Sequence, residues 1–304
     1  MADFFSSYWN LFPVTFAQSL LYAFVALGVM IPFRLLNFPD LSCEGTFPLG
    51  GCLCAALIAA KLPPGVAMLA AVAAGFAAGC ATAAIHLRLR INTLLAGILV
   101  ITMLWSLDLR IMGKSNVPLF SLPNVFDAWW PQFTQNVTAQ IVFWLALSAA
   151  AVLLLHWFLR TELGLVVRAV GANDTMARAN GVNVGRVLLF GVGAANAVVA
   201  FAGAAVAQIQ GYADVAMGFG MLISGLAALI IGEAIAGRET VFRQILAPFL
   251  GSAVYYQVIS LGLAAGVHPS DLKMVTALFV LVTLGLPTLR RQAKTPQAEP
   301  RLRA

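Results

Sequence analysis

Long apolar segments alternate with short polar ones along almost the whole chain. The apolar windows cover residues 14–35, 41–60, 64–86, 91–110, 139–159, 187–208, 218–236, 241–263 and 273–288. Each is close to the roughly 20 residues that an α-helix needs to cross the hydrocarbon core of a bilayer. The pattern therefore predicts an all-α polytopic membrane bundle of about nine transmembrane helices, with eight to ten as the range.

The composition agrees with a bilayer location. Hydrophobic residues occupy 61% of the 304 positions and charged residues only 10%, and the mean hydropathy is +0.90. A soluble domain carries about 25% charged residues, so this chain cannot cover itself with polar surface and lipid must be its solvent. We expect residues 1–289 to form a single transmembrane domain and residues 290–304 to form a polar cytoplasmic tail.

Lysine and arginine residues stand at the ends of the apolar segments, singly or in pairs. Despite the net charge of +6, this distribution argues against a nucleic-acid partner and resembles the excess of basic residues on the cytoplasmic side of membrane proteins. If the loop 160–186 is cytoplasmic, four of the 18 basic residues lie outside and the rest lie inside. The asymmetry predicts a cytoplasmic C-terminus and, with nine spans, an external N-terminus. A tenth, re-entrant or broken segment would change only the N-terminal prediction.

Two apolar segments are interrupted by glycine or proline beside an acid. The first interruption, "NFPDLSCEGTFPLGG", contains Asp40 and Glu44, and the second, "QGYADVAMGFG", contains Asp214. Interrupted segments in the two halves of a chain are a strong sequence indication of a transport site. We therefore assign five residues to a translocation pathway: Asp40, Ser42, Glu44, Thr46 and Asp214. The alternative is that these acids merely cap helices at loop boundaries.

The most polar internal stretch is "RAVGANDTMARANGVNVGR", residues 168–186. Asn173 or Asp174 supplies an oxygen that caps a helix N-terminus, the run "TMARA" follows, and Asn180-Gly181 suits a helix C-terminus. A helix of one or two turns is marginal in water, so we expect another protein to pack on it. A plain surface loop is the alternative.

Other motifs offer little chemistry. The stretch "GEAIAGRET" resembles a phosphate-binding loop, but it lacks the lysine and following hydroxyl and joins two membrane segments. The three histidines are far apart, and the four cysteines lie in apolar stretches without zinc-ligand spacing. We expect no metal site, no cofactor and no nucleotide site belonging to this chain, and we place Glu233 at the cytoplasmic interface near Arg238.

Several segments together resemble the permeases of ATP-binding-cassette (ABC) importers of the branched-chain amino acid and ribose class. Besides "RAVGANDTMARANGVN", these segments are "FPDLSCEGTFPLGG", "INTLLAGILVITMLWSLDLRIMGKSNVPL", "AQIQGYADVAMGFGMLISGLAALIIGEAI" and "HPSDLKMVTALFV". They occur in the same order as in the branch that is paired with tryptophan/tyrosine-type or uncharacterised binding proteins. The chain departs from that branch at Cys43-Glu44, where Val-Asp is usual, and at Trp105, where Tyr is usual.

The resemblance implies a permease of the type II ABC importer kind in a bacterial cytoplasmic (inner) membrane. It would take a small polar solute, an amino acid or a related compound, from an extracytoplasmic binding protein. A separate cytoplasmic ATPase dimer would bind the ATP and dock on the short helix. The residues of this coupling helix are Asn173, Asp174, Met176, Arg178, Asn180 and Gly181. A second permease copy would complete a homodimer, which the small-residue motif "GFAAG" at residues 75–79 also allows.

Two other functional classes compete with this interpretation. An ion-coupled secondary transporter would explain acids at broken helices, but it leaves the short capped helix without a role. An intramembrane enzyme would need a converging set of His, Asp and Glu residues, which the sequence does not indicate. Dependence of transport on ATP rather than on an ion gradient separates the first alternative from the importer.

Overall fold

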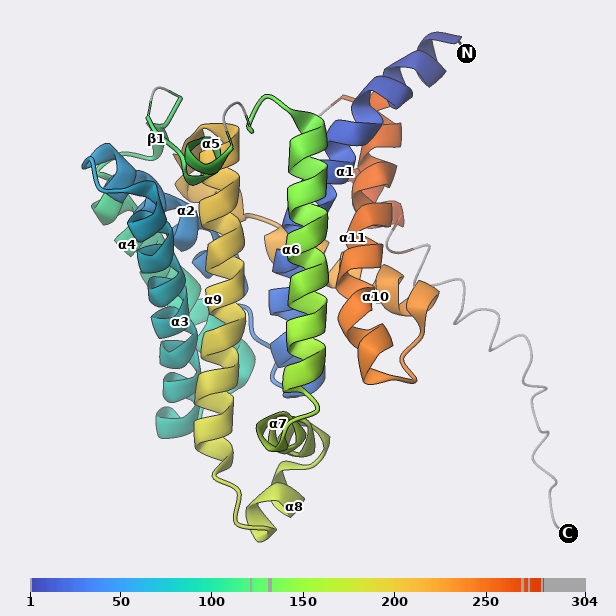
Figure 1. Cartoon of the computed structure of the whole chain (residues 1–304). Coiled ribbons are helices and arrows are strands. Elements are labelled where there is room, and N and C mark those ends of the chain that lie inside the picture. Colours follow the sequence, from blue (N-terminus) through green and yellow to red (C-terminus); the bar gives the residue numbers. More distant parts are fainter. Residues whose placement is uncertain are drawn as a thin grey trace, which may run out of the picture.

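The computed structural model describes residues 2–120, 122–130, 133–268, 271, 272, 274–279 and 281. Its helices form an upright bundle whose upper and lower ends are named here as they appear in Figure 1. The helices are α1 (Ala2–Met30), α2 (Cys43–Ala59), α3 (Pro64–Leu89), α4 (Thr93–Met112), α5 (Val125–Trp129), α6 (Val137–Phe158), α7 (Glu162–Ala172), α8 (Asp174–Ala179), α9 (Val184–Gln210), α10 (Met221–Ala236) and α11 (Val241–Ala264). A π-helical turn η1 (Ile31–Leu35), a 3-10 turn η2 (Val215–Gly218) and strands β1 (Asn116–Pro118) and β2 (Tyr212–Asp214) complete the described elements.

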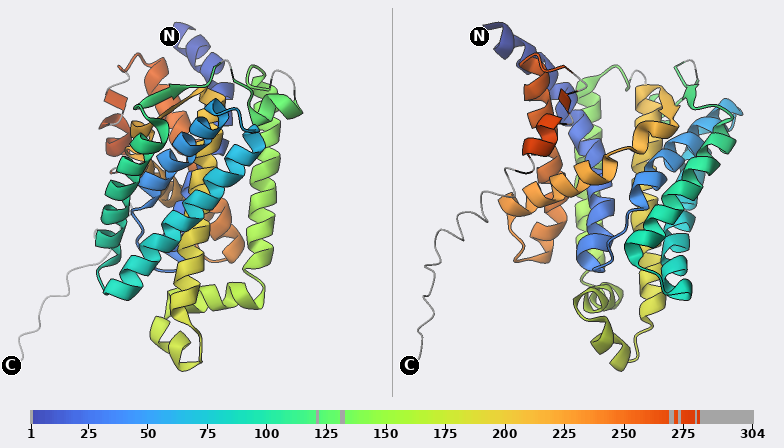
Figure 2. Two further views of the ribbon diagram at one scale, coloured as in Figure 1. Left: turned by 90° about the vertical axis from the view of Figure 1, so that its left-hand side faces the viewer. Right: turned by 180° about the vertical axis from the view of Figure 1, so that it is seen from behind.

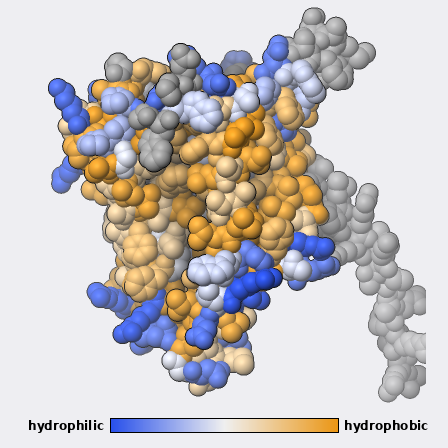
Figure 3. All heavy atoms as spheres, in the orientation of Figure 1, coloured by the Kyte–Doolittle hydropathy of each residue, from blue (hydrophilic) through white to orange (hydrophobic). Residues whose placement is uncertain are grey.

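The predicted polytopic all-α class is confirmed. Within the described residues, seven helical segments are long and apolar enough to cross a membrane, and η2 with α10 counts as one of them. The predicted span 41–60 is also a helix, but α2 has only 17 residues because the break at residues 36–42 shortens it. The ninth predicted span, 273–288, lies mostly outside the described residues, and the predicted tail 290–304 lies wholly outside them. Figure 3 shows a broad apolar belt between polar ends.

Asparagine residues mark where several long helices begin. The side-chain oxygens of Asn92, Asn136 and Asn183 accept hydrogen bonds of 2.9, 3.2 and 3.1 Å from backbone N–H groups in the first turns of α4, α6 and α9. These bonds satisfy N–H groups that have no partner within the helix itself. The polar residues between apolar windows therefore set the helix ends.

Small residues let α9 run through the centre of the bundle against α2 and α3. At Gly79, an added Cβ atom would lie 2.5 Å from the Val192 carbonyl oxygen, and at Gly203 it would lie 1.9 Å from the Phe47 carbonyl oxygen. Neither gap admits a side chain, so the backbones are in contact, as small residues permit in lipid. The "GFAAG" motif of α3 thus packs against α9 of the same chain, so it does not supply a contact to a second copy.

Two features of the ends were not predicted. The amphipathic helix α7 lies across the lower end of the bundle beside α8 (Figure 1), in a stretch after the predicted span 139–159 for which the sequence predicted no helix. Gly171 lies inside α7, where an added Cβ atom would be 1.9 Å from the Leu35 carbonyl oxygen. At the upper end, β1 and β2 pair in antiparallel fashion and join the loop after α4 to the loop after α9.

The basic residues that the sequence places inside predict that the lower end faces the cytoplasm. Thr175 in α8 and Ser115 before β1 are both exposed, at opposite ends. A membrane-impermeant maleimide should therefore label Ser115→Cys in intact cells and Thr175→Cys only after permeabilisation. The unsubstituted chain is the control, because Cys43, Cys52 and Cys54 are buried and Cys80 is half-buried. Labelling of Thr175→Cys in intact cells would contradict this orientation.

Candidate functional site

The two interrupted segments meet inside the bundle. Residues 36–42 lead into α2, and residues 211–220 lead into α10, which begins part-way along the bundle in the rear view (Figure 2, right). The Glu44 carboxylate oxygen Oε1 accepts a hydrogen bond of 2.7 Å from the Gly220 backbone N–H. At Gly218, an added Cβ atom would lie 2.2 Å from the Glu44 carbonyl oxygen. The two halves of the chain therefore share one junction at their breaks.

A hollow of about 250 Å³ lies at this junction. Its lining comes from the start of α2, from α4 and from η2 with the residue after it: Glu44, Gly45, Pro48, Ile101, Trp105, Asp108, Val215, Gly218 and Phe219. The rings of Trp105 and Phe219 are 5.2 Å apart between centroids and are tilted by 33°. No lysine, arginine or histidine is among the lining residues. The hollow thus combines two carboxyl groups with two aromatic rings.

Behind the hollow, Asn196 of α9 organises the first break. Its side-chain nitrogen Nδ2 donates to Asp40 Oδ2 at 2.7 Å, and its oxygen Oδ1 accepts from the hydroxyls of Thr46 at 2.7 Å and Ser42 at 3.3 Å. Asp40 also accepts a 2.8 Å bond from the Ser42 backbone N–H. All four side chains are buried. This network holds the non-helical segment against α9, and the assignment of Asp40, Ser42 and Thr46 to a pathway stays a prediction.

Asp214 lies apart from this network, at the upper end. Its Oδ1 accepts a 2.7 Å bond from the Ala216 backbone N–H and caps η2, and its Oδ2 accepts a 3.1 Å bond from the Asn116 side chain. Asp214 therefore joins the strand pair to the turn that leads down to the hollow. Its assignment to the pathway also stays a prediction.

The predicted short helix is present as α8. The Asn173 side-chain oxygen accepts a 2.9 Å bond from the Met176 backbone N–H, as expected of an N-cap, and Gly181 follows with a φ of 81°. The Met176 side chain is 65% exposed. Arg178 lies 3.8 Å from Asp174, between Nε and Oδ2. The assignment of α8 as a docking helix stays a prediction.

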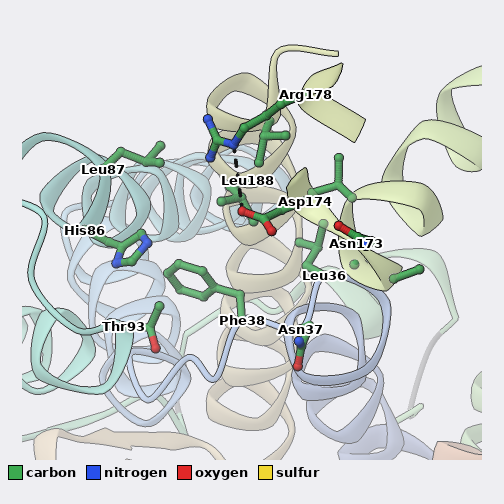
Figure 4. Close-up of a pocket in the computed structure, with 14 residues that line it drawn as sticks. Leu36, Asn37, Phe38, His86, Leu87, Thr93, Asn173, Asp174, Arg178 and Leu188 are labelled. Carbon is green, nitrogen blue, oxygen red and sulfur yellow. Dashed lines mark ion pairs between the residues drawn. The ribbon is translucent and has the colours of Figure 1, made fainter. Parts of the chain in front are cut away.

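A groove of about 240 Å³ adjoins α8 and links it to the first break. Figure 4 shows Asp174 and Arg178 on one side of the groove, with Phe38, from the segment before α2, and His86 of α3 on the other. The close approach of Gly171 in α7 to Leu35 ties the same end of the bundle to η1. The segment that precedes α2 therefore lies beside α7 and α8.

Sequence reasoning assigned no pathway role to four residues of the site. Trp105, Asp108 and Phe219 line the hollow, and Asn196 is the hub of the network. An acid within the apolar window 91–110 was an available signal for Asp108, because intramembrane acids are costly and mark functional positions. Asn196 and Phe219 carried no comparable signal. The predicted location of Glu233 near Arg238 is confirmed, since its carboxylate pairs with Arg238 and also with Arg34.

These features define a class of protein. A multi-pass helical bundle in which two broken segments meet at a hollow, with a helical hairpin exposed at one end, is typical of a membrane permease. Residues 14–285 match the family model described as "Branched-chain amino acid transport system / permease component". The chain therefore belongs to this family of ABC importer permeases.

Curated relatives cover most of the chain. A tyrosine transport system permease protein of Clostridioides difficile (strain R20291) is 36% identical over 282 residues, 93% of each chain. An uncharacterised protein of Rickettsia prowazekii (strain Madrid E) is 29% identical and spans 90% of this chain and 97% of its own. The ribose import permease of Escherichia coli (strain K12) is 24% identical and spans 82% of this chain and 81% of its own. No solved structure matches this chain.

The Asn196 network predicts a large effect on stability. Asn196→Leu keeps the approximate volume but leaves the buried Asp40 and Thr46 groups without their partner, at about 1–3 kcal/mol for each unsatisfied group. The purified variant should therefore melt at a clearly lower temperature. Ser252→Ala is the matched control, because the Ser252 hydroxyl is buried and has no hydrogen-bond partner within the described part of the chain. Equal melting of both variants would show that the network does not stabilise the break.

Proposed function

We propose that this chain is the permease subunit of an importer that takes up an amino acid or a related small polar solute. The observation that carries the proposal is α8, an exposed and capped helix with an apolar side chain. It lies at the end of a bundle whose helix breaks meet at a hollow lined by two acids and two aromatic rings. A second protein that binds a docking helix of this kind can move the helices of the bundle. Membership of the ABC importer permease family supports an ATPase as that second protein.

The proposed cycle divides the chemistry between subunits. A cytoplasmic ATPase dimer binds and hydrolyses ATP, and the permease itself requires no cofactor. An extracytoplasmic binding protein delivers the solute at the upper end, near β1 and β2. Closure of the ATPases moves α7 and α8, and the contacts of Gly171 with Leu35 transmit the movement to the break before α2. We place the protein in a bacterial cytoplasmic membrane, with its C-terminus in the cytoplasm.

The relatives support the solute class. The permease named for tyrosine transport shares 36% identity over 93% of the chain, whereas the ribose permease shares 24%. An amino acid is therefore the better supported solute. A hollow that contains two carboxyl groups also fits a solute with a positive charge better than a neutral sugar.

The position of the hollow supports a homodimer. Its rim residues Trp105 and Phe219 are 36% and 58% exposed in the single chain. Irregular backbone and carboxyl groups at membrane depth are tolerated where protein or water, not lipid, borders them. A second copy related by a two-fold axis would cover this face and enclose the pathway between the two chains.

An ion-coupled secondary transporter is a second candidate. The observation in its favour is Asp108, a buried carboxyl group without a hydrogen-bond partner within the described residues. Uptake into vesicles that requires ATP and survives collapse of the ion gradients would exclude this candidate. Uptake that depends on an ion gradient and does not require ATP would exclude the importer.

Reversal of the charge on α8 should uncouple the two subunits. Arg178→Glu places a negative side chain beside Asp174 on the proposed docking surface, so the ATPase should no longer co-purify and uptake should fall about tenfold or more, a loss typical of a lost charged interface contact. An exposed substitution of this kind rarely unfolds a protein. Lys61→Glu makes the same change at the opposite end, and it should retain the ATPase. Normal uptake by Arg178→Glu would count against α8 as the coupling element.

The homodimer can be tested by cross-linking at the rim of the hollow. Phe219→Cys should form a covalent pair with a short bifunctional maleimide in native membranes, because the proposed two-fold axis brings the two rims together. Leu153→Cys on α6 is 63% exposed but lies away from the hollow, so it should stay monomeric. A single-copy mass for the permease in mild detergent, together with no cross-link at Phe219, would refute the homodimer.

A further inference from the structure

Asp108 is a buried acid of α4 that lines the hollow. Its residue is 0% exposed, and neither carboxylate oxygen has a hydrogen-bond partner in the described part of the chain. A buried carboxyl group without a partner is costly in an apolar environment. Asp108 is among the residues that line the hollow, and the hydrogen-bond capacity of its carboxyl group is unused. A ligand that enters the hollow could therefore supply the hydrogen-bond donors that this carboxyl group lacks.

Glu44 brings a second carboxylate to the same hollow. Its Oε1 is held by the Gly220 backbone N–H at 2.7 Å, whereas Oε2 makes no hydrogen bond within the described residues. That single bond fixes the orientation of the carboxylate and leaves one oxygen for a ligand. Since none of the lining residues is basic, the ligand itself must bring positive charge.

The apolar part of the hollow limits the ligand further. Trp105 and Phe219 present neighbouring rings, 5.2 Å apart, to the space that the two carboxylates line. Aromatic faces attract cations and stack against flat apolar groups. The volume of about 250 Å³ is below the range of roughly 300–1,000 Å³ for sites of drug-sized ligands, so the ligand is small.

We infer that the hollow binds the protonated amino group of the transported solute between Asp108 and Glu44, with the flat or aromatic body of the solute against Trp105 and Phe219. An ammonium group has three donors and no acceptor, which matches the free oxygens of the two carboxylates. A neutral sugar has no charge to offer, and a carboxylate without an amine would be repelled. The inference rests on the proposed function as a permease and names the chemistry by which that permease recognises its solute.

Direct binding to the permease alone tests this recognition without the selectivity of a binding protein. The full chain is reconstituted in nanodiscs, and radiolabelled tyramine, an aromatic amine without a carboxylate, is the probe. Unlabelled tyramine and L-tyrosine should displace it. 3-(4-Hydroxyphenyl)propionate, which lacks the amine, and ribose should not displace it at concentrations tenfold higher. Sodium chloride should weaken binding only by general screening, equally with potassium chloride.

Two variants separate the proposed contacts from folding. Asp108→Asn and Glu44→Gln should each weaken tyramine binding about 30-fold or more, as expected when one member of a buried charge pair is lost. Glu239→Gln removes an exposed carboxylate away from the hollow and should bind tyramine normally. Asp108→Asn should melt at or above the temperature of the unsubstituted chain, because it removes an unpartnered buried carboxylate. A structural role for Asp108 would instead lower the melting temperature.

Several outcomes would overturn the inference. They are the absence of tyramine binding, equal displacement by the deaminated acid or by ribose, specific displacement by Na⁺, and unchanged binding by Asp108→Asn. ATP-driven uptake of tyrosine by the complete importer is measured in parallel. If the importer takes up tyrosine but the permease does not bind tyramine selectively, this inference alone is wrong. If the permease binds tyramine but the importer shows no ATP-driven uptake, the proposed function is wrong.

Discussion

The hydrogen bond between the Glu44 carboxylate and the Gly220 backbone N–H is the contact on which this architecture depends. A helix that breaks inside a bilayer exposes backbone groups that lipid cannot satisfy. Here each break lies against the other, and the glycines of the second break let the two backbones touch. The arrangement joins the two halves of the chain at the same place where it opens a hollow lined by Glu44 and Asp108.

The central helix α9 supports this junction from behind. Asn196 supplies both a donor and an acceptor to the segment before α2, so buried polar groups that would otherwise be costly satisfy one another. The same helix begins next to α8, with Asn183 as its cap. One continuous element therefore connects the proposed docking helix to the network that shapes the hollow. A rigid helix between two such places transmits displacement better than a loop would.

Burial and exposure divide the acids of the membrane region into two kinds. Asp40 and Glu233 have partners that neutralise or hydrogen-bond them, and these contacts hold neighbouring segments together. Asp108 has no such partner within the described residues, and Glu44 has one free oxygen. The acids therefore differ in how much hydrogen-bonding capacity the surrounding protein uses.

The sequence by itself determined the membrane class, most helix positions and the two breaks, because hydropathy, glycine, proline and asparagine act locally. It also predicted a cap of α8 by Asn173 or Asp174, of which the structure has Asn173, and the neighbourhood of Glu233 and Arg238. The meeting of Glu44 with Gly220, the hub at Asn196 and the isolation of Asp108 depended on the tertiary structure. These relations join residues that are far apart in the chain, and they arise only when small residues bring α2, α4, α9 and α10 into contact. The amphipathic helix α7 was missed for a related reason, since its short apolar face is recognisable only against η1 and α9.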